Sequence, residues 1–246
     1  NHAVQGSASL KPVYKTGVIN GQPAVRFSSG KYMETPLVPA TGAGARTFIA
    51  VIKNGQSVSG SSAEMILHYG SSAKSQAYGL AYKKLGTTKI GTDYWDGGLA
   101  SSFNSSSESL IIESVYTGTQ DVVYVNGVEV GRQTAALNTG SANPLRIGKI
   151  IAINGYYFTG DIAEIIVYNR AITDQERQEI EGYLTDKYLP IDPPPFTEEG
   201  LKLWLAADKI QGVSDGEAVS GWQDASGNNN HAVQGSASLK PVYKTG

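Results

Sequence analysis

The sequence predicts an all-β fold, an antiparallel sandwich of two sheets with one short helix near the end of its main body. Short runs rich in β-branched and aromatic residues recur along the 246 residues, separated by turn signals such as Asn-Gly and Gly-Ser. A helical repeat of apolar residues stands out once, late in the chain. Strands do not alternate with long helices, so we do not expect a parallel α/β sheet.

Strands in the first half are predicted from apolar runs that end at turn residues. Residues 46–53 contain an unbroken run of Thr, Phe, Ile, Ala and Val, which is typical of a strand buried on both faces. Asn54 and Gly55 provide the turn after it. Further strands are predicted at residues 24–27, 64–68 and 77–82.

The second half contains the strongest short-range signal, a β-hairpin within residues 121–130. Two runs, VVYV and VEV, flank Asn126 and Gly127. Both of these residue types accept the positive φ angles of a type I′ turn, whose twist matches that of paired strands. The other strands predicted here are residues 109–116, 145–148 and 160–168.

One helix is predicted between Thr173 and Pro190. Thr173 provides an N-cap and Glu176 stands three residues later, the arrangement in which each side chain satisfies a free amide of the first turn. Pro190 ends the helix. The apolar stripe expected to pack on the edge of the sandwich consists of Ile180, Tyr183, Leu184 and Tyr188.

A seventeen-residue segment occurs twice. Residues 1–17, NHAVQGSASLKPVYKTG, return letter for letter as residues 230–246, so the second copy begins 229 residues after the first. Chance does not produce such a match. The chain therefore reads as a window on a tandem repeat, seen in permuted register.

The natural start of the repeating unit is predicted after a proline-rich linker at residues 190–195, because four prolines there favour a stiff extended spacer. Residues 1–189 are then the main body of one repeat without its opening strand. Residues 196–246 are the opening segment of the next repeat, with a strand at 201–205. This segment completes either its own body or a neighbouring one, and we expect head-to-tail strand exchange.

Composition limits the functional classes. The net charge of −2 gives no electrostatic basis for binding nucleic acid or an anionic membrane. No apolar run approaches the roughly 20 residues that a membrane helix needs, so membrane insertion is not expected. The chain lacks cysteine, which excludes disulfides and thiolate metal sites. Twenty-nine glycines and a polar, uncharged surface composition favour an extracellular, turn-rich β protein.

Four segments resemble a known family. The motifs are LKLWLAAD at 201–208, WQDASGNNNHAV at 222–233, GQPAVRF at 21–27, and residues 158–188 as closing strand and helix. Together they resemble the laminin-G-like, concanavalin A-like jelly-roll domains of bacterial extracellular proteins. The resemblance implies a jelly-roll sandwich in a secreted or cell-surface protein. That family includes carbohydrate-binding modules, adhesin repeats and accessory domains of polysaccharide-degrading enzymes.

The loop Asp93-Tyr94-Trp95-Asp96 is the candidate ligand-binding site, and Tyr156-Tyr157 in another glycine-bounded loop could join it, with Tyr157 as the expected ligand contact. An exposed aromatic ring offers an apolar face to the C–H face of a sugar, and flanking carboxylates accept hydroxyl protons. The alternative is that Trp95 folds inward and caps the core.

Asp224 and Asn228 form a candidate calcium site, because oxygen ligands spaced around a glycine turn suit a hard cation. The resemblance adds Glu164 as a carboxylate from the closing strand. The alternative is a loop in which Asp224 and Asn228 bond their own backbone. The histidines, His68 among them, are more often structural than metal-binding.

We do not expect an enzyme. Glucanases of similar fold use closely spaced carboxylates on one strand, whereas Glu113 and Glu164 each stand alone on their strands. The expected function is a non-enzymatic building unit of a bacterial surface adhesin or fibre, whose partners are copies of itself. The alternative is a carbohydrate-binding module of a secreted polysaccharide-degrading enzyme, which binds cell-surface, plant or microbial glycans.

Overall fold

The computed structural model describes residues 2–28, 30–54, 63–84, 86–189, 199–207, 210 and 213–244. The chain divides into two compact units, Asn1–Ile191 and Asp192–Gly246, called unit 1 and unit 2 below. The predicted linker at 190–195 lies outside the described residues.

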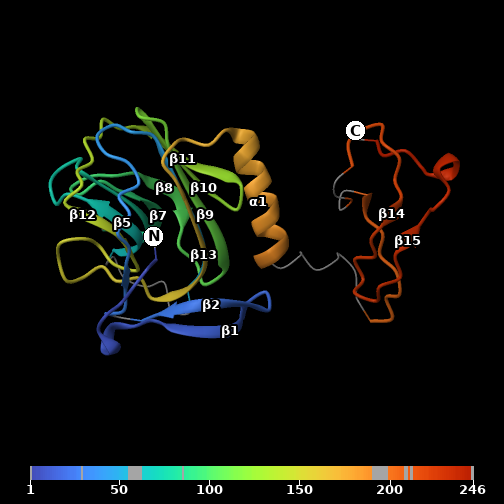
Figure 1. The fold of residues 1–246 in the computed structure, drawn as a ribbon, viewed down its shortest axis with the longest axis horizontal. Helices are drawn as coiled ribbons and strands as arrows, with labels where there is room; N and C mark the ends of the chain where they lie inside the picture. The colour runs from blue at the N-terminus through green and yellow to red at the C-terminus, as the bar shows by residue number, and fades with distance from the viewer. Residues whose placement is uncertain are drawn as a thin grey trace. The chain divides into compact units, whose positions relative to one another are not determined.

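Unit 1 is a sandwich of two antiparallel sheets with one α-helix (Figure 1), as the sequence predicts for a concanavalin A-like jelly roll. The seven-stranded sheet runs in the order β1 (Val13–Ile19), β2 (Gln22–Phe27), β13 (Gly160–Tyr168), β4 (Arg46–Lys53), β9 (Ser109–Tyr116), β10 (Gln120–Val125) and β11 (Val128–Thr134). The six-stranded sheet runs in the order β3 (Met33–Glu34), β12 (Asn143–Ile147), β5 (Glu64–Gly70), β6 (Ala77–Lys83), β7 (Lys89–Asp93) and β8 (Ala100–Asn104).

The two-faced burial predicted for residues 46–53 is confirmed in β4. Phe48, Ala50 and Ile52 pack into the main core between the sheets, whereas Ile49 and Val51 pack on the opposite face beneath the helix. Successive side chains of a strand point to opposite faces, so only a continuous apolar run fills both layers.

The hairpin predicted at residues 121–130 is confirmed as β10 and β11. Val125 pairs with Val128 across the turn, and Asn126 and Gly127 have φ angles of 46° and 77°. The strands β1, β3, β7 and β8 were not predicted. Serine, threonine and glycine dilute their apolar pattern, and pairing with neighbours stabilises them instead.

Helix α1 (Asp174–Tyr188) begins with the predicted capping box between Thr173 and Glu176. Two predictions about its packing are wrong. The helix covers the face of the seven-stranded sheet rather than its edge, since Leu184 and Tyr188 share a cluster with residues of the central strands β4 and β9. Tyr183 is half exposed and lies outside the buried stripe.

Unit 2 contains a short ladder of β14 (Gly221–Trp222) and β15 (Ala232–Val233). The strand predicted at residues 201–205 does not form, and only Leu205 makes an isolated bridge, to Asp224. A single short strand needs neighbours in a sheet to be stable, and the described part of unit 2 offers only this bridge. Short 3₁₀ helices occur at the same place in both copies of the repeated segment, η1 (Ala8–Leu10) and η3 (Ala237–Leu239).

Candidate functional site

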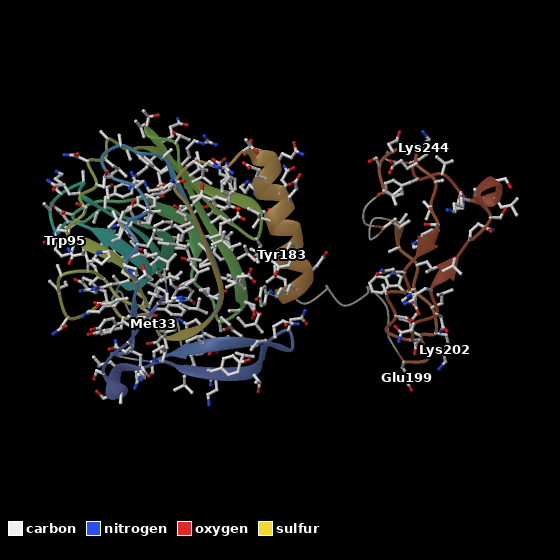
Figure 2. The ribbon with its side chains drawn as sticks, viewed as in Figure 1. Met33, Trp95, Tyr183, Glu199, Lys202 and Lys244 are labelled. Atoms are coloured by element: carbon white, nitrogen blue, oxygen red, sulfur yellow. The ribbon has the colours of Figure 1, made fainter. Side chains whose placement is uncertain are left out.

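The outer face of the six-stranded sheet carries an apolar cluster of its own. Met65 from β5 and Ala81 from β6 point away from the main core and pack with Ala63 and Ile150. The rings of Trp95 and Tyr156 lie against this cluster, and both are partly buried. Figure 2 shows Trp95 at the margin of unit 1, away from α1. The face therefore brings together two aromatic rings from loops that are far apart in the sequence.

The backbone of the Trp95 loop is held in an unusual conformation. Trp95 and Asp96 have φ angles of 60° and 58°, in the left-handed region that non-glycine residues rarely adopt. The Trp95 N–H donates to Asp93 Oδ1 at 2.8 Å, which fixes the turn. Such strain persists only where surrounding contacts impose it, and it concentrates at functional sites.

A buried polar base supports this turn. Asp93 Oδ1 lies 3.1 Å from His68 Nε2, and Lys84 Nζ donates to Asp93 Oδ2 at 3.2 Å. The His68 ring is fully buried and lies edge-on to the Trp95 indole, with centroids 6.5 Å apart. Gly79 makes room for the imidazole, since a Cβ there would lie 2.4 Å from His68 Cδ2.

Asp93 stays ionised in this setting. Burial pushes its pKa up, but the hydrogen bond and charge of His68, together with Lys84 and the Trp95 amide, hold the pKa of Asp93 below its usual value. The pairing joins strands β5 and β7 through residues 25 positions apart, so the sequence alone gave no partner for His68.

Of the two tyrosines named from the sequence, Tyr156 packs against the same cluster as Trp95, whereas Tyr157, the expected ligand contact, does not. The Met65 N–H donates to the Tyr156 carbonyl at 3.1 Å, which places the Tyr156 loop along β5. The Tyr157 ring lies instead near Lys149, whose Nζ is 5.4 Å from the ring centroid and 4.6 Å from that of Tyr32. Tyr156 has a φ angle of 50°, in the left-handed region, so the backbone turns there and the two adjacent rings reach different neighbours.

The predicted loop divides between the surface and the interior. Asp96 is exposed, and Asp93 lies beneath it in the polar base. Tyr94 lies in the main core, where its hydroxyl donates to the Asp121 carboxylate, and burial raises the pKa of Tyr94 well above its usual value. Successive side chains of a strand point to opposite faces, so the alternation along Thr92, Asp93 and Tyr94 is the signal that would have separated these side chains.

The Asp224 carboxylate in unit 2 is already saturated with donors. Its Oδ1 accepts from the N–H groups of Trp204 and Ser226, both at 2.8 Å. Its Oδ2 accepts from the Ser226 hydroxyl at 2.8 Å and the Asn230 N–H at 3.0 Å. These four contacts engage both carboxylate oxygens, so a cation that binds at the Asp224 loop would have to displace some of these donors.

The other two predicted ligands are similarly engaged. Asn228 Nδ2 donates to the Leu201 carbonyl at 2.9 Å. Glu164, on β13 of unit 1, accepts from Lys187 Nζ at 2.9 Å and from the Tyr188 hydroxyl at 2.8 Å. Among the described residues, no three His, Cys, Asp or Glu side chains gather as a metal-binding group. Calcium binding stays a prediction.

Glu113 and His231 make structural contacts. Glu113 is buried beneath α1, where its Oε2 lies 3.4 Å from Arg177 Nη1. His231 Nδ1 accepts from the Asp224 N–H at 3.0 Å.

A family model described as the concanavalin A-like lectin/glucanases superfamily matches residues 27–176, which lie within unit 1. The match covers more than half of the chain and confirms the resemblance inferred from the motifs. No curated protein matches the chain.

Several solved structures share the fold at low sequence identity. The CBM40 of the Ruminococcus gnavus IT-sialidase, bound to α2,3-sialyllactose, is 15% identical with a TM-score of 0.51, over 69% of this chain and 98% of that one. Domain 4 of AbnA, an extracellular GH43 arabinanase from Geobacillus stearothermophilus, in complex with arabinotriose, is 17% identical with a TM-score of 0.51, over 70% and 81%. A putative carbohydrate binding protein from Bacteroides ovatus is 18% identical with a TM-score of 0.51, over 86% and 58%.

Proposed function

The chain belongs to the concanavalin A-like lectin/glucanase superfamily, and from this premise we propose that unit 1 is a non-catalytic carbohydrate-binding module. Its proposed binding surface is formed by Trp95, Asp96 and Tyr156 on the outer face of the six-stranded sheet. The observation that carries the proposal is that two half-buried aromatic rings, Trp95 and Tyr156, pack against one apolar cluster.

The chemistry of this surface suits a sugar. An indole or phenol ring offers a flat apolar face to the C–H groups of a pyranose or furanose. The exposed Asp96 carboxylate accepts hydrogen bonds from hydroxyl groups nearby. The buried Asp93, His68 and Lys84 hold the Trp95 turn in place before a ligand arrives, which lowers the entropy lost on binding.

The comparisons support the same class of ligand. The CBM40 and the arabinanase domain share the fold and were solved with sialyllactose and arabinotriose, respectively. They favour the carbohydrate-binding alternative of the sequence prediction over the adhesin or fibre. The glycan that this chain binds is left to experiment.

A glycan array with the full chain tests the proposal. We expect selective binding of one glycan class, and Trp95→Ala should weaken it about ten-fold or more, which corresponds to about 1.4 kcal/mol. Tyr183→Ala is the matched control, because Tyr183 is a half-exposed aromatic residue on α1, away from Trp95. Equal binding by wild type and Trp95→Ala, with both proteins folded, would reject this surface.

The seventeen-residue repeat supports a second candidate function, a building unit of an extracellular array such as an adhesin or fibre. The unchanged recurrence of these seventeen residues favours a structural repeat, and a repeat of this kind can also bind glycans. No helix among the described residues is both long and apolar enough to cross a membrane. We infer a secreted or surface location from the kind of ligand proposed.

A further inference from the structure

The two copies of the repeated segment keep the same local structure in different surroundings. Gln5 Oε1 accepts from the Ser7 N–H at 3.0 Å, and Gln234 Oε1 accepts from the Ser236 N–H at 3.0 Å. Each copy then enters a 3₁₀ helix. Because the segment determines its own backbone, its contacts in unit 1 and in unit 2 can be compared residue by residue.

In unit 1 the segment adds to the edge of the six-stranded sheet. The Val4 N–H donates to the Glu34 carbonyl at 2.7 Å, and the Glu34 N–H donates back to the Val4 carbonyl at 2.9 Å. Val4 therefore faces β3. Further along, β1 pairs with β2 at the edge of the seven-stranded sheet.

In unit 2 the same segment pairs through its other edge. The Gln234 N–H, equivalent to that of Gln5, donates to the Ser220 carbonyl at 2.9 Å. Neighbouring residues of an antiparallel strand present their N–H and C=O groups to opposite sides. The backbone groups of Val233, equivalent to those of Val4, therefore lie on the side away from β14. Unit 2 thus keeps its internal pairing and still presents the edge that β3 binds in unit 1.

A groove in unit 1 corresponds to a segment of unit 2 that ends in β14. Residues 216–222 of unit 2 run beside both halves of the segment, with the Val219 N–H donating to the Pro241 carbonyl and the Tyr243 N–H to the Glu217 carbonyl, both at 2.8 Å. In unit 1 the equivalent residues line an open hollow of about 380 Å³, called here the edge groove. Its lining includes Ala3, Gln5, Lys11, Tyr14, Val25 and Met33.

The edge groove leads towards more apolar surface. Val25 and Met33 also line an adjoining hollow of about 140 Å³, whose other walls include Phe27, Ile147 and Ile162. In Figure 2, Met33 lies close to the strands β1 and β2. Some residues of the segment are more exposed in unit 2 than in unit 1. Leu239 is 68% exposed, whereas the equivalent Leu10 is half-buried.

We propose that unit 2 of one chain replaces residues 2–17 in unit 1 of a second copy, so that residues 216–222 fill the edge groove and the chains associate head to tail. The residues exchanged are identical, so every bond to β3 and β2 is remade, and the contacts in the groove are added. Gly246 corresponds to Gly17, which is followed by Val18 at the start of a body. Unit 2 therefore matches the opening segment of a second body of this kind.

One substitution in the two equivalent positions tests the proposal, because proline has no N–H to donate to Glu34. Val4→Pro weakens the binding of residues 2–17 to their own unit 1, so the variant should begin to associate at a protein concentration about five-fold lower than wild type. Val233→Pro removes the N–H that would donate to Glu34 of the second copy, so it should raise that concentration about five-fold. Pairing inside unit 2 is unaffected, because the Val233 N–H faces away from β14. A chain lacking residues 1–17 should associate more readily than either.

The measurement is molar mass by light scattering across a concentration series, with circular dichroism to verify that each variant is folded. Shifts of Val4→Pro and Val233→Pro in the same direction would overturn the proposal. So would a monomer at every concentration for Val4→Pro and for the chain lacking residues 1–17. A monomer whose Trp204 fluorescence changes in these variants would show that unit 2 binds its own chain instead. The proposal does not depend on glycan binding.

Discussion

The surroundings of Glu113 disfavour the ionised form of its carboxyl group. It is fully buried, its Oε1 has no partner among the described atoms, and Arg177 contacts only its Oε2. Burial first, and then the nearby charge of Glu181, raise the pKa of Glu113 from 4.5 to about 7, against the pull of Arg177. Between these values the folded protein holds a proton that the unfolded chain has lost.

This difference gives stability a pH dependence of known sign. The contribution of Glu113 to the free energy of unfolding is greatest below the unfolded pKa and falls as the pH rises towards about 7. Glu113→Gln has no such proton. The free energy of unfolding of Glu113→Gln, measured relative to that of wild type, should therefore rise by at most about 3 kcal/mol between pH 4 and pH 8.

Urea unfolding at a series of pH values measures this gain, with the exposed Glu108→Gln as control. Parallel pH profiles for wild type and Glu113→Gln would contradict the assignment, whereas Glu108→Gln should follow wild type throughout.

At the candidate site, the sequence predicts the surface loop but not the partners of its side chains. The polar residues and glycines around Trp95 predict a surface loop, and the structure has a loop there in which Asp96 is exposed. The roles of Asp93 and Tyr94 depend on strands that pair across the sheet, so His68 and Asp121 could not be identified as their partners. The donors around Asp224 were hidden for a related reason, because one of them is the backbone N–H of Trp204, twenty residues away.

Helix α1 tests how one element is held to the sheet. Leu184 is fully buried among residues that include Ile49 and Val51. Leu184→Ala leaves a cavity in that layer and should lower the free energy of unfolding by about 2–5 kcal/mol. Gln178→Ala, an exposed position on the same helix, should change it by no more than about 0.5 kcal/mol.

Urea denaturation followed by far-ultraviolet circular dichroism compares the two helix variants. Equal, small losses would mean that α1 does not depend on its packing against β4 and β9. A large loss in Gln178→Ala would mean that the exposed face of α1 has a partner.

Elements with local signals were predictable from the sequence, and elements that need distant partners were not. The capping box of Thr173 and Glu176 and the Asn126-Gly127 turn each lie within a few residues, and both form. Residues 201–205 have the alternation of a strand but no adjacent strand in the described part of unit 2. The insertion of β13 between β2 and β4 joins segments more than 100 residues apart, which no local pattern reveals.

At the scale of the whole molecule, the two units differ in how much core they contain. In unit 1, buried side chains fill three apolar clusters on and between the sheets. In the described part of unit 2, only Val219 and Asp224 are buried. Folding of a segment this short, with so little buried apolar surface, leaves little net stability. The repeat and the proline-rich stretch could be read from the sequence, but this imbalance in burial could not.

The imbalance predicts that unit 2 opens far more often than unit 1 in the native protein. Trypsin should therefore cut at Lys202 and Lys244, exposed residues labelled in Figure 2, well before it cuts at Arg46 or Lys83, which are buried in unit 1. Mass spectrometry of a digestion time course in dilute protein follows each cut. Cleavage after Lys202 should release residues 203–246 and leave a resistant fragment that contains both sheets and α1. Cleavage of both units at one rate would mean that they unfold together, and unit 2 would then owe its order to contacts with a sandwich rather than to its own few buried residues.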